Sequence, residues 1–166
     1  MNKKFAIHKY IYLFFVTSIM GWFGEVLFGL FVHHKLVNPG TLCGMWCPIY
    51  GVACVLISFL FKKADGLIKN FIKITFISLI VEYISAFISE EFFNHQLWDY
   101  SNFFFNFQGR VCLSMGILFG IVGLVFAYFL LPKLTSFFEK NAKQCIKLNV
   151  ILLFLFLVNI GIECII

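Results

Sequence analysis

The sequence predicts an all-α fold, a membrane helix bundle with about five transmembrane helices in a single transmembrane domain over residues 1–166. Hydrophobic residues make up 61% and charged residues 13% of the chain, whereas about 25% of an ordinary soluble domain is charged. The apolar residues are also gathered into runs of about 20, the length that crosses a hydrocarbon core of about 30 Å. The lysines lie between these runs. We therefore expect a multi-pass protein surrounded by a lipid bilayer.

Five segments have the length and composition of a membrane-spanning helix. They cover residues 10–33, 42–61, 71–89, 111–131 and 148–166. The first is too long for the core of a secretory signal peptide and lacks a small-residue cleavage site, so we expect a retained span. No segment shows the alternation of apolar and polar residues that is typical of a strand.

The connection between the fourth and fifth spans has the pattern of a cytoplasmic interfacial helix over residues 133–147. One helical face is apolar and the other is charged. The apolar face consists of Leu134, Phe137, Phe138, Cys145 and Ile146, and the charged face of Glu139, Lys140, Lys143 and Lys147. Such a helix lies in the membrane surface, so we expect a lipid anchor, with docking of a cytoplasmic partner as the alternative.

The basic residues predict the orientation of the spans. Eleven of the 13 Lys and Arg residues fall on one side: Lys3, Lys4, Lys9, Lys62, Lys63, Lys69, Lys73, Lys133, Lys140, Lys143 and Lys147. Only Lys35 and Arg110 fall on the other. Because cytoplasmic loops carry the excess of Lys and Arg, we expect the N-terminus inside and the C-terminus outside. Nucleic acid is not an expected partner, since these lysines lie between apolar runs and form no soluble basic face.

The acidic residues show the opposite bias. Six of the 8 acids fall in the outer half of the bundle or in its outer loops: Glu25, Glu82, Glu90, Glu91, Asp99 and Glu163. Acids hardly influence membrane insertion, so the topology alone does not require this arrangement. The bias predicts a polar site that faces outward.

Two of these acids, Glu25 and Glu82, lie well inside predicted spans. Each shares a helical face with small or hydroxyl residues, among them Gly21 beside Glu25 and Ser78 beside Glu82. A charged residue at this depth costs about 2.5 to 3.5 kcal/mol, so both should face protein or water. Intramembrane acids are typical of functional sites, and the alternative is a packing role through hydrogen bonds to a neighbouring helix.

The second span opens with the stretch Asn38 to Gly51, NPGTLCGMWCPIYG, which is rich in helix breakers. Pro48 removes a backbone donor, so either a broken helix lining a cavity or a simple proline kink is expected there. Cys43 and Cys47 lack zinc-site spacing, and we predict no metal and no cofactor. In the fourth span, Gly116 and Gly120 form a GxxxG pattern that indicates close helix contact, within one chain or across a dimer.

The stretch LWDYSNFFFNFQGR, residues 97–110, lies in the outer loop between the third and fourth spans. Its aromatic residues suit the membrane interface, where aromatic rings are enriched. That location does not explain Asp99, Asn106 and Arg110. We expect these residues to close a polar site over Glu25 and Glu82, with Arg110 as the partner of an acid or of an anionic ligand.

Several short fragments occur in a characteristic order between about residues 20 and 125. They are Gly21, Trp22 and Glu25; Asn38 and Gly40; Cys47, Pro48, Ile49, Tyr50 and Gly51; Glu82 and Tyr83; Trp98, Asp99 and Tyr100; and Asn106, Gly109 and Arg110. As an ordered set they resemble the bacterial membrane family labelled “putative ABC-transporter type IV permeases”. The fifth span lies outside this resemblance. It implies a permease of the bacterial plasma membrane and adds Asn38, Tyr50, Tyr83 and Trp98 to the candidate substrate-binding residues.

The leading functional hypothesis is a permease-like transporter subunit whose outward polar site, built from Glu25, Glu82, Asp99 and Arg110, binds a small solute or ion. The chain contains no GxxxxGK[ST] phosphate loop, so any ATP coupling needs a separate ATPase subunit. Five spans are few for a translocation path, which favours a homo-oligomer or a partner permease. One alternative is an intramembrane enzyme that uses two glutamates as acid and base on a lipid or peptide, although no nucleophile with an adjacent base is visible. The other is a non-transporting assembly or sensor protein.

Overall fold

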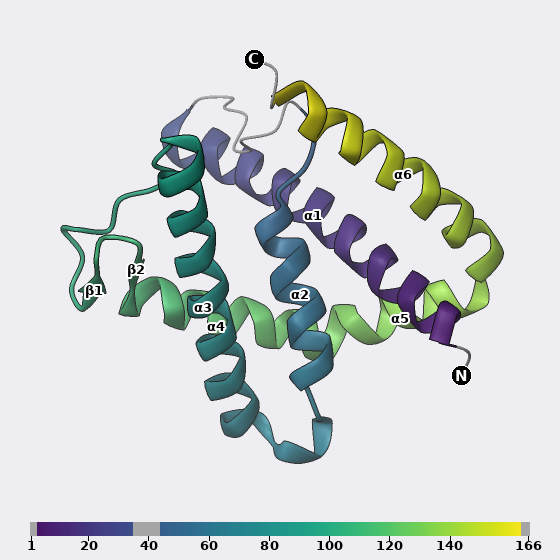
Figure 1. Cartoon of the computed structure of the whole chain (residues 1–166). Coiled ribbons are helices and arrows are strands. Elements are labelled where there is room, and N and C mark those ends of the chain that lie inside the picture. The colour runs from purple at the N-terminus through teal and green to yellow at the C-terminus, as the bar shows by residue number, and fades with distance from the viewer. Residues whose placement is uncertain (1–2, 35–43, 164–166) are drawn as a thin grey trace. The chain divides into compact units, whose positions relative to one another are not determined.

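The computed structural model describes residues 3–34 and 44–163, and these residues are helical except for loops and one short hairpin (Figure 1). In chain order the elements are α1 (Lys3–His33), α2 (Pro48–Leu60), the 3-10 turn η1 (Lys63–Asp65), α3 (Leu67–Phe93), the strands β1 (Asn106–Phe107) and β2 (Val111–Cys112), α4 (Leu113–Val125), the π-helical turn η2 (Phe126–Leu130), α5 (Leu131–Lys140) and α6 (Ala142–Glu163). The predicted all-α class is confirmed. The expectation that no strand would form is wrong for β1 and β2, because a two-residue pair is too short to show a periodic pattern.

Four helical stretches within the described residues are long and apolar enough to cross a membrane. They are Lys4–Phe31, Leu67–Phe93, Leu113–Lys140 and Ala142–Ile162. The chain is therefore a multi-pass membrane protein whose surroundings include a lipid bilayer. The second predicted span differs, because α2 has only 13 residues, or about 20 Å at 1.5 Å per residue, and a hydrocarbon core is about 30 Å thick.

Helix α2 is short because it begins late. Pro48 is its first residue, a position where proline has no intrahelical donor to lose. The residues just before it, Gly44 to Cys47, are not helical. Of the two arrangements expected from the sequence, the proline kink within a continuous helix is wrong, and Pro48 instead starts a helix that follows an irregular segment.

The third and fourth long stretches meet at Asn141. Helices α4 and α5 follow one another without a break through η2, and the Asn141 amide donates to the Phe137 carbonyl to close the last turn of α5. Helix α6 then starts at Ala142. Residues 133–147, expected to form one interfacial helix, are thus divided between α5 and the first turns of α6.

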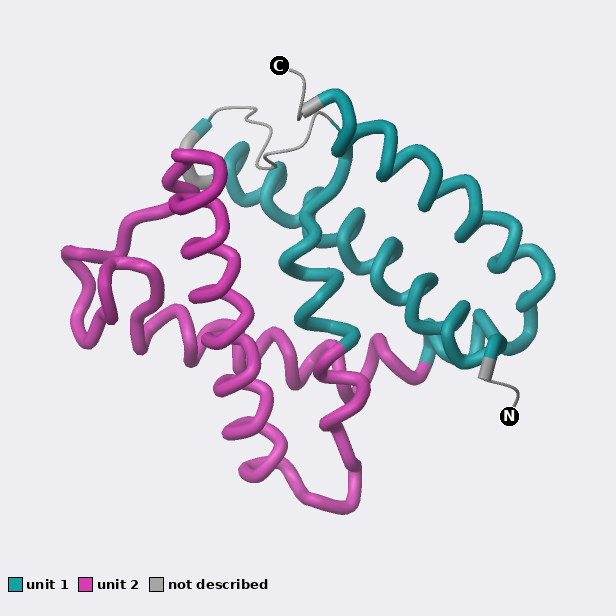
Figure 2. The backbone as a smooth tube through the Cα atoms, in the orientation of Figure 1, with its two compact units in different colours: residues 1–55, 133–166 teal, residues 56–132 magenta. Residues whose placement is uncertain are grey.

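Two compact units make up the chain, and the boundaries fall within α2 and at the start of α5 (Figure 2). Unit 1 comprises residues 1–55 and 133–166. Its core is aromatic: the Phe15 ring lies 5.7 Å from the Trp46 ring and 5.8 Å from the Phe156 ring. The Asn149 side-chain amide donates to the His8 carbonyl at 2.7 Å. This bond joins α6 to α1, the two helices that pack together in this unit.

Unit 2 comprises residues 56–132, and its centre is the contact between α3 and α4. The contact uses the glycine face that the sequence singled out. Gly116 faces Leu79, Gly120 faces Thr75 and Phe71, and Gly123 faces Ile74. The GxxxG pattern therefore serves a helix contact within one chain, where small residues let the two backbones approach closely.

Candidate functional site

Residues 97–112 fold into a loop that ends in a short β-hairpin, called here the hairpin. Strands β1 and β2 pair in antiparallel register, with Asn106 opposite Cys112 and Phe107 opposite Val111. The turn between them needs left-handed backbone at Gly109, whose φ is +68°, a conformation that glycine adopts without the steric cost of a side chain. The Tyr100 amide donates to the Gly109 carbonyl at 2.8 Å, so the arriving chain is tied to the turn.

Two candidate site residues, Asp99 and Asn106, form their hydrogen bonds within this hairpin loop. Asp99 accepts from the Ser101 amide at 2.8 Å and from the Ser101 hydroxyl at 2.6 Å. These bonds, the hydroxyl one foremost, lower the pKa of the Asp99 carboxyl below its ordinary value. Asn106 donates to the carbonyls of Ser101 and Phe103 and accepts from the Gly109 amide. Both side chains therefore shape the loop.

Trp98 also holds the hairpin together. Its indole nitrogen donates to the Arg110 carbonyl at 2.8 Å, and its ring stacks on Tyr100 with 6.2 Å between centroids. Arg110 lies in the turn between β1 and β2, so the bond ties the start of the loop to this turn. Phe104 and Phe105 in the same loop are exposed, so the membrane-interface location predicted for the aromatic rings of this loop is compatible with the role of Trp98.

Arg110 clamps the hairpin onto α3. Its Nε and Nη2 atoms each lie 2.7 Å from Oε2 of Glu90, and this hydrogen bond is the main reason that the pKa of Arg110 is raised. Its Nη1 atom donates to Gln108 at 2.7 Å and to the Tyr83 hydroxyl at 3.3 Å. The guanidinium also lies over the rings of Tyr83 and Phe87, at 5.5 and 5.2 Å.

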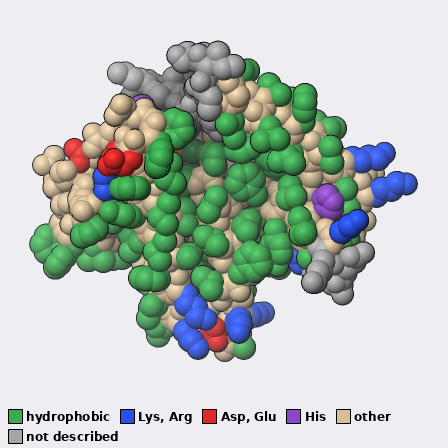
Figure 3. All heavy atoms as spheres, in the orientation of Figure 1, with side chains coloured by type: hydrophobic (Ala, Val, Ile, Leu, Met, Phe, Trp, Pro, Cys, Tyr) green, Lys and Arg blue, Asp and Glu red, His purple; other side chains and the backbone are tan. Residues whose placement is uncertain are grey.

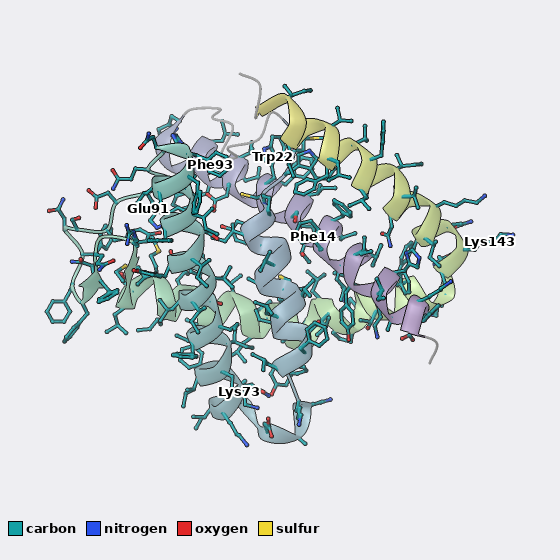
Figure 4. All side chains as sticks on the ribbon, in the orientation of Figure 1. Phe14, Trp22, Lys73, Glu91, Phe93 and Lys143 are labelled. Carbon is teal, nitrogen blue, oxygen red and sulfur yellow. The ribbon has the colours of Figure 1, made fainter. Side chains whose placement is uncertain are left out.

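The partner of Arg110 is therefore Glu90, an acid that was not among the candidate site residues. Figure 4 labels Glu91 and Phe93 at the end of α3 that carries Glu90. A guanidinium suits this place because its planar fork can serve an acid, an amide and a hydroxyl together. With all three nitrogens engaged, Arg110 positions the loop and is not an open anchor for an anion.

Glu82 lies beneath this hairpin. It is 2% exposed, and it shares a buried face of α3 with Ser78 and Ser89, as the sequence spacing predicted. The Tyr100 hydroxyl hydrogen-bonds to the Glu82 carboxyl group. The Oε2 atom of Glu82 has no hydrogen-bond partner among the described residues. A buried carboxyl oxygen without a partner is costly, which makes it a candidate contact for a ligand, an ion or a proton.

The second intramembrane acid, Glu25, belongs to unit 1. Its carboxylate accepts a hydrogen bond from the Tyr50 hydroxyl, and Tyr50 packs closely against Gly21 on α1. Glu25 and Tyr50 are thus brought together, and both are candidate site residues. Each intramembrane glutamate is held by a tyrosine from another segment of its own unit: Glu25 by Tyr50 in unit 1 and Glu82 by Tyr100 in unit 2.

The other candidate residues divide as follows. Tyr83 belongs to the Arg110 clamp, since its hydroxyl donates to Gln108 at 2.8 Å. Asn38 and Cys43 lie outside the described residues, as do Pro39 and Gly40. Cys47 is buried and not in a disulfide. In residues 3–34 and 44–163, no group of three or more His, Cys, Asp and Glu side chains could hold a metal ion.

The sequence pattern did not predict the roles of four residues: Tyr100, Ser101, Gln108 and Glu90. Tyr100 lies inside the quoted WDY fragment, and Ser101 follows an aspartate in the spacing of a side-chain-capped turn, so both had a local signal. Glu90 and Gln108 had no such local signal. Glu90 contacts Arg110 across 20 residues, and the contact between Gln108 and Arg110 depends on the conformation of the turn.

Comparison with known proteins gives a family and no closer relative. A family model described as “Putative ABC-transporter type IV” matches residues 12–163. No curated protein and no solved structure matches the chain. The resemblance drawn from the sequence fragments is confirmed, but its extent was underestimated, because the match continues through α6 to residue 163.

Proposed function

Since this chain belongs to the family described as “Putative ABC-transporter type IV”, we propose that it is a permease-like subunit of the bacterial plasma membrane that binds a small solute or ion at Glu82. The observation that carries this proposal is the buried Oε2 atom of Glu82, which has no partner among the described residues. The adjoining positive charge, Arg110, is already paired with Glu90. The atom without a partner is therefore a carboxyl oxygen, which favours a cation or a hydrogen-bond donor as the bound species.

In this proposal the hairpin covers the binding site at Glu82. Tyr100 holds one end of the Glu82 carboxyl group, and the Arg110 clamp keeps the segment that carries Tyr100 on α3. A solute reaching Glu82 from outside would then pass this aromatic loop. Glu25, held by Tyr50 in unit 1, is the second acidic site that the proposal assigns to binding.

The subunit is proposed to act with partners. The family name points to transport coupled to ATP, and this chain has no phosphate loop of its own. A separate ATPase subunit would supply the hydrolysis. A second copy of the chain or a partner permease would complete the translocation path, because the four full-length spans and one short apolar helix of the described residues are few for a pore.

The test is replacement of Glu82 by glutamine, which keeps the size and hydrogen-bonding capacity of the side chain but cannot ionise. We expect Glu82→Gln to abolish complementation of a deletion strain while its membrane abundance stays near that of the wild type. Glu91→Gln is the matched control, because Glu91 is an exposed acid on the same helix, and it should complement fully. Full complementation by Glu82→Gln would refute the site and favour the assembly or sensor hypothesis.

The proposed topology has five crossings, with the N-terminus inside and the C-terminus outside. Helix α2 is short, but the irregular residues 44–47 before it can add at most about 13 Å, for a total of about 33 Å. Such backbone is tolerated at membrane depth only where protein satisfies it. The Cys47 amide meets this condition, because it donates to the Ser18 carbonyl on α1 at 3.2 Å.

Cysteine labelling tests this topology. Asn102 in the hairpin and Ala64 in η1 are both exposed and make suitable sites. We expect a membrane-impermeant thiol reagent to label Asn102→Cys in intact cells, and to label Ala64→Cys only after the cells are opened, since the lysine asymmetry places η1 inside. The parent protein, with its own six cysteines, gives the background. Labelling of Ala64→Cys and not of Asn102→Cys in intact cells would invert the orientation.

A further inference from the structure

Four lysines gather at the connection between α2 and α3. Lys62 precedes the η1 turn, Lys63 is its first residue, and Lys69 and Lys73 lie on the first turns of α3. Figure 3 shows blue side chains gathered around a red acid at the connection between α2 and α3, at the bottom of the view, and Figure 4 labels Lys73 there. Asp65 is the sole acid between residues 56 and 81. Four lysines against one aspartate leave a formal charge of +3 at this connection, which we call the η1 lysine cluster.

Asp65 holds two of the four lysines in place but does not neutralise the charge of the cluster. Its Oδ1 atom lies 3.4 Å from Nζ of Lys69, and its Oδ2 atom bonds to Lys73. The bond to Lys73 is the main reason that the pKa of Asp65 is lowered, so the acid stays charged and holds both lysines. Lys62 and Lys63 are exposed, and among the described residues neither forms an ion pair.

The backbone that carries Lys62 and Lys63 is held in place. Asn70 is fully buried, and its side-chain amide donates to the Lys62 carbonyl at 2.9 Å and to the Tyr128 hydroxyl at 3.2 Å. The Lys62 carbonyl also accepts from the Asp65 amide. Tyr128 comes from the π-helical turn η2 and its ring packs on Phe61. The cluster is therefore preorganised, which lowers the entropy cost of binding an anion.

An apolar stripe runs from this cluster along α3. Ile68, Ile72 and Phe76 are four residues apart, so they share one helical face, and they are 77%, 61% and 65% exposed. In a membrane protein, a strongly exposed apolar stripe on a spanning helix contacts lipid acyl chains. Because the stripe begins beside Lys69, basic and acyl-binding surfaces adjoin at the end of the span.

We propose that the η1 lysine cluster binds the phosphate of an anionic phospholipid, whose acyl chain lies along Ile68, Ile72 and Phe76. Lysine ammonium groups bind phosphate as point charges, and clusters of basic residues beside a span are typical of anionic lipid recognition. The apolar stripe distinguishes this ligand from a free phosphate, which would need the lysines alone. The site is independent of Glu82 and of any transport activity.

The experiment uses the purified full chain in neutral detergent, titrated with phosphatidylglycerol or with phosphatidylcholine of the same acyl chains, and bound lipid is counted by native mass spectrometry. The wild type should prefer phosphatidylglycerol. The double variant Lys62→Gln, Lys63→Gln should bind it roughly 20- to 30-fold more weakly, since each lysine near an anionic headgroup contributes a factor of about five. Lys62→Arg, Lys63→Arg should keep the preference, because the charge remains.

Matched controls separate this site from general attraction. Lys133→Gln, Lys140→Gln removes two exposed lysines from α5, and it should leave the preference intact. Ile68→Ser, Ile72→Ser should weaken lipid binding although all lysines remain. Wild-type affinity in the Lys62→Gln, Lys63→Gln variant would overturn the proposal. So would displacement of the lipid by an equal concentration of glycerol phosphate, which would make the ligand a free phosphate.

Discussion

Replacing Gly120 by leucine is expected to remove the folded protein from the membrane. A Cβ atom added at Gly120 would lie 2.1 Å from Oγ1 of Thr75 and 2.7 Å from Cε2 of Phe71, and no real Cβ atom makes such contacts. Thr75 is β-branched and has few χ1 rotamers open to it in a helix, and the Phe71 ring contacts the same position, so we expect α3 and α4 to separate. Overpacking a close contact costs about 1–3 kcal/mol for small additions, and leucine adds four carbons.

The measurement is the recovery of monodisperse protein from membranes, followed by its thermal unfolding in detergent. Gly24→Leu is the control, because a Cβ built at Gly24 on α1 has no described atom within 4 Å apart from its chain neighbours and the nearby backbone of its own helix. It adds the same side chain to another apolar helix and should behave like the wild type. Gly120→Ala should be intermediate. If Gly120→Leu were recovered and melted like the wild type, the α3–α4 contact in unit 2 would be wrong.

Replacing Arg110 by lysine is expected to release the hairpin from α3 and to abolish function. A single ammonium nitrogen cannot reproduce the three contacts that the guanidinium makes with Glu90, Gln108 and Tyr83. It also loses the planar stacking on the rings of Tyr83 and Phe87. Once the clamp is broken, Tyr100 should no longer be held against Glu82, so activity should fall together with order in the loop.

Hydrogen exchange of the amides of residues 98–112 measures this release directly. We expect severalfold faster exchange there in Arg110→Lys, with α4 and α3 protected as in the wild type. Glu90→Gln should produce a weaker version of the same change, because glutamine can still accept a hydrogen bond. The neighbouring substitution Glu91→Gln should have no effect. Unchanged exchange in Arg110→Lys would show that the hairpin does not depend on its clamp.

Local sequence was enough to determine the class of the protein and most of its helices. A segment that crosses lipid must be helical, because exposing unpaired polar backbone groups to lipid is costly. This requirement is the same for every spanning segment, so the hydropathy and length of an apolar run are enough to predict a helix. They therefore predicted α1, α3, α4 and α6 to within several residues. The spacing of Gly116 and Gly120 predicted a close contact, and the spacing of Glu82 and Ser78 a shared buried face. The ordered fragments predicted the family.

Tertiary structure decided which polar groups meet. The sequence predicted that Asp99, Asn106 and Arg110 would close over Glu25 and Glu82, with Arg110 as the partner of an acid or of an anionic ligand. In the fold, Asp99 and Asn106 form hydrogen bonds within the loop, Arg110 pairs with Glu90, and Tyr100 hydrogen-bonds to Glu82. These partners follow from the left-handed backbone at Gly109 and from the packing of the hairpin on α3. Hydrogen bonds are short and directional, so a pairing across 20 residues depends on the positions of both side chains in the fold, which no local sequence pattern specifies.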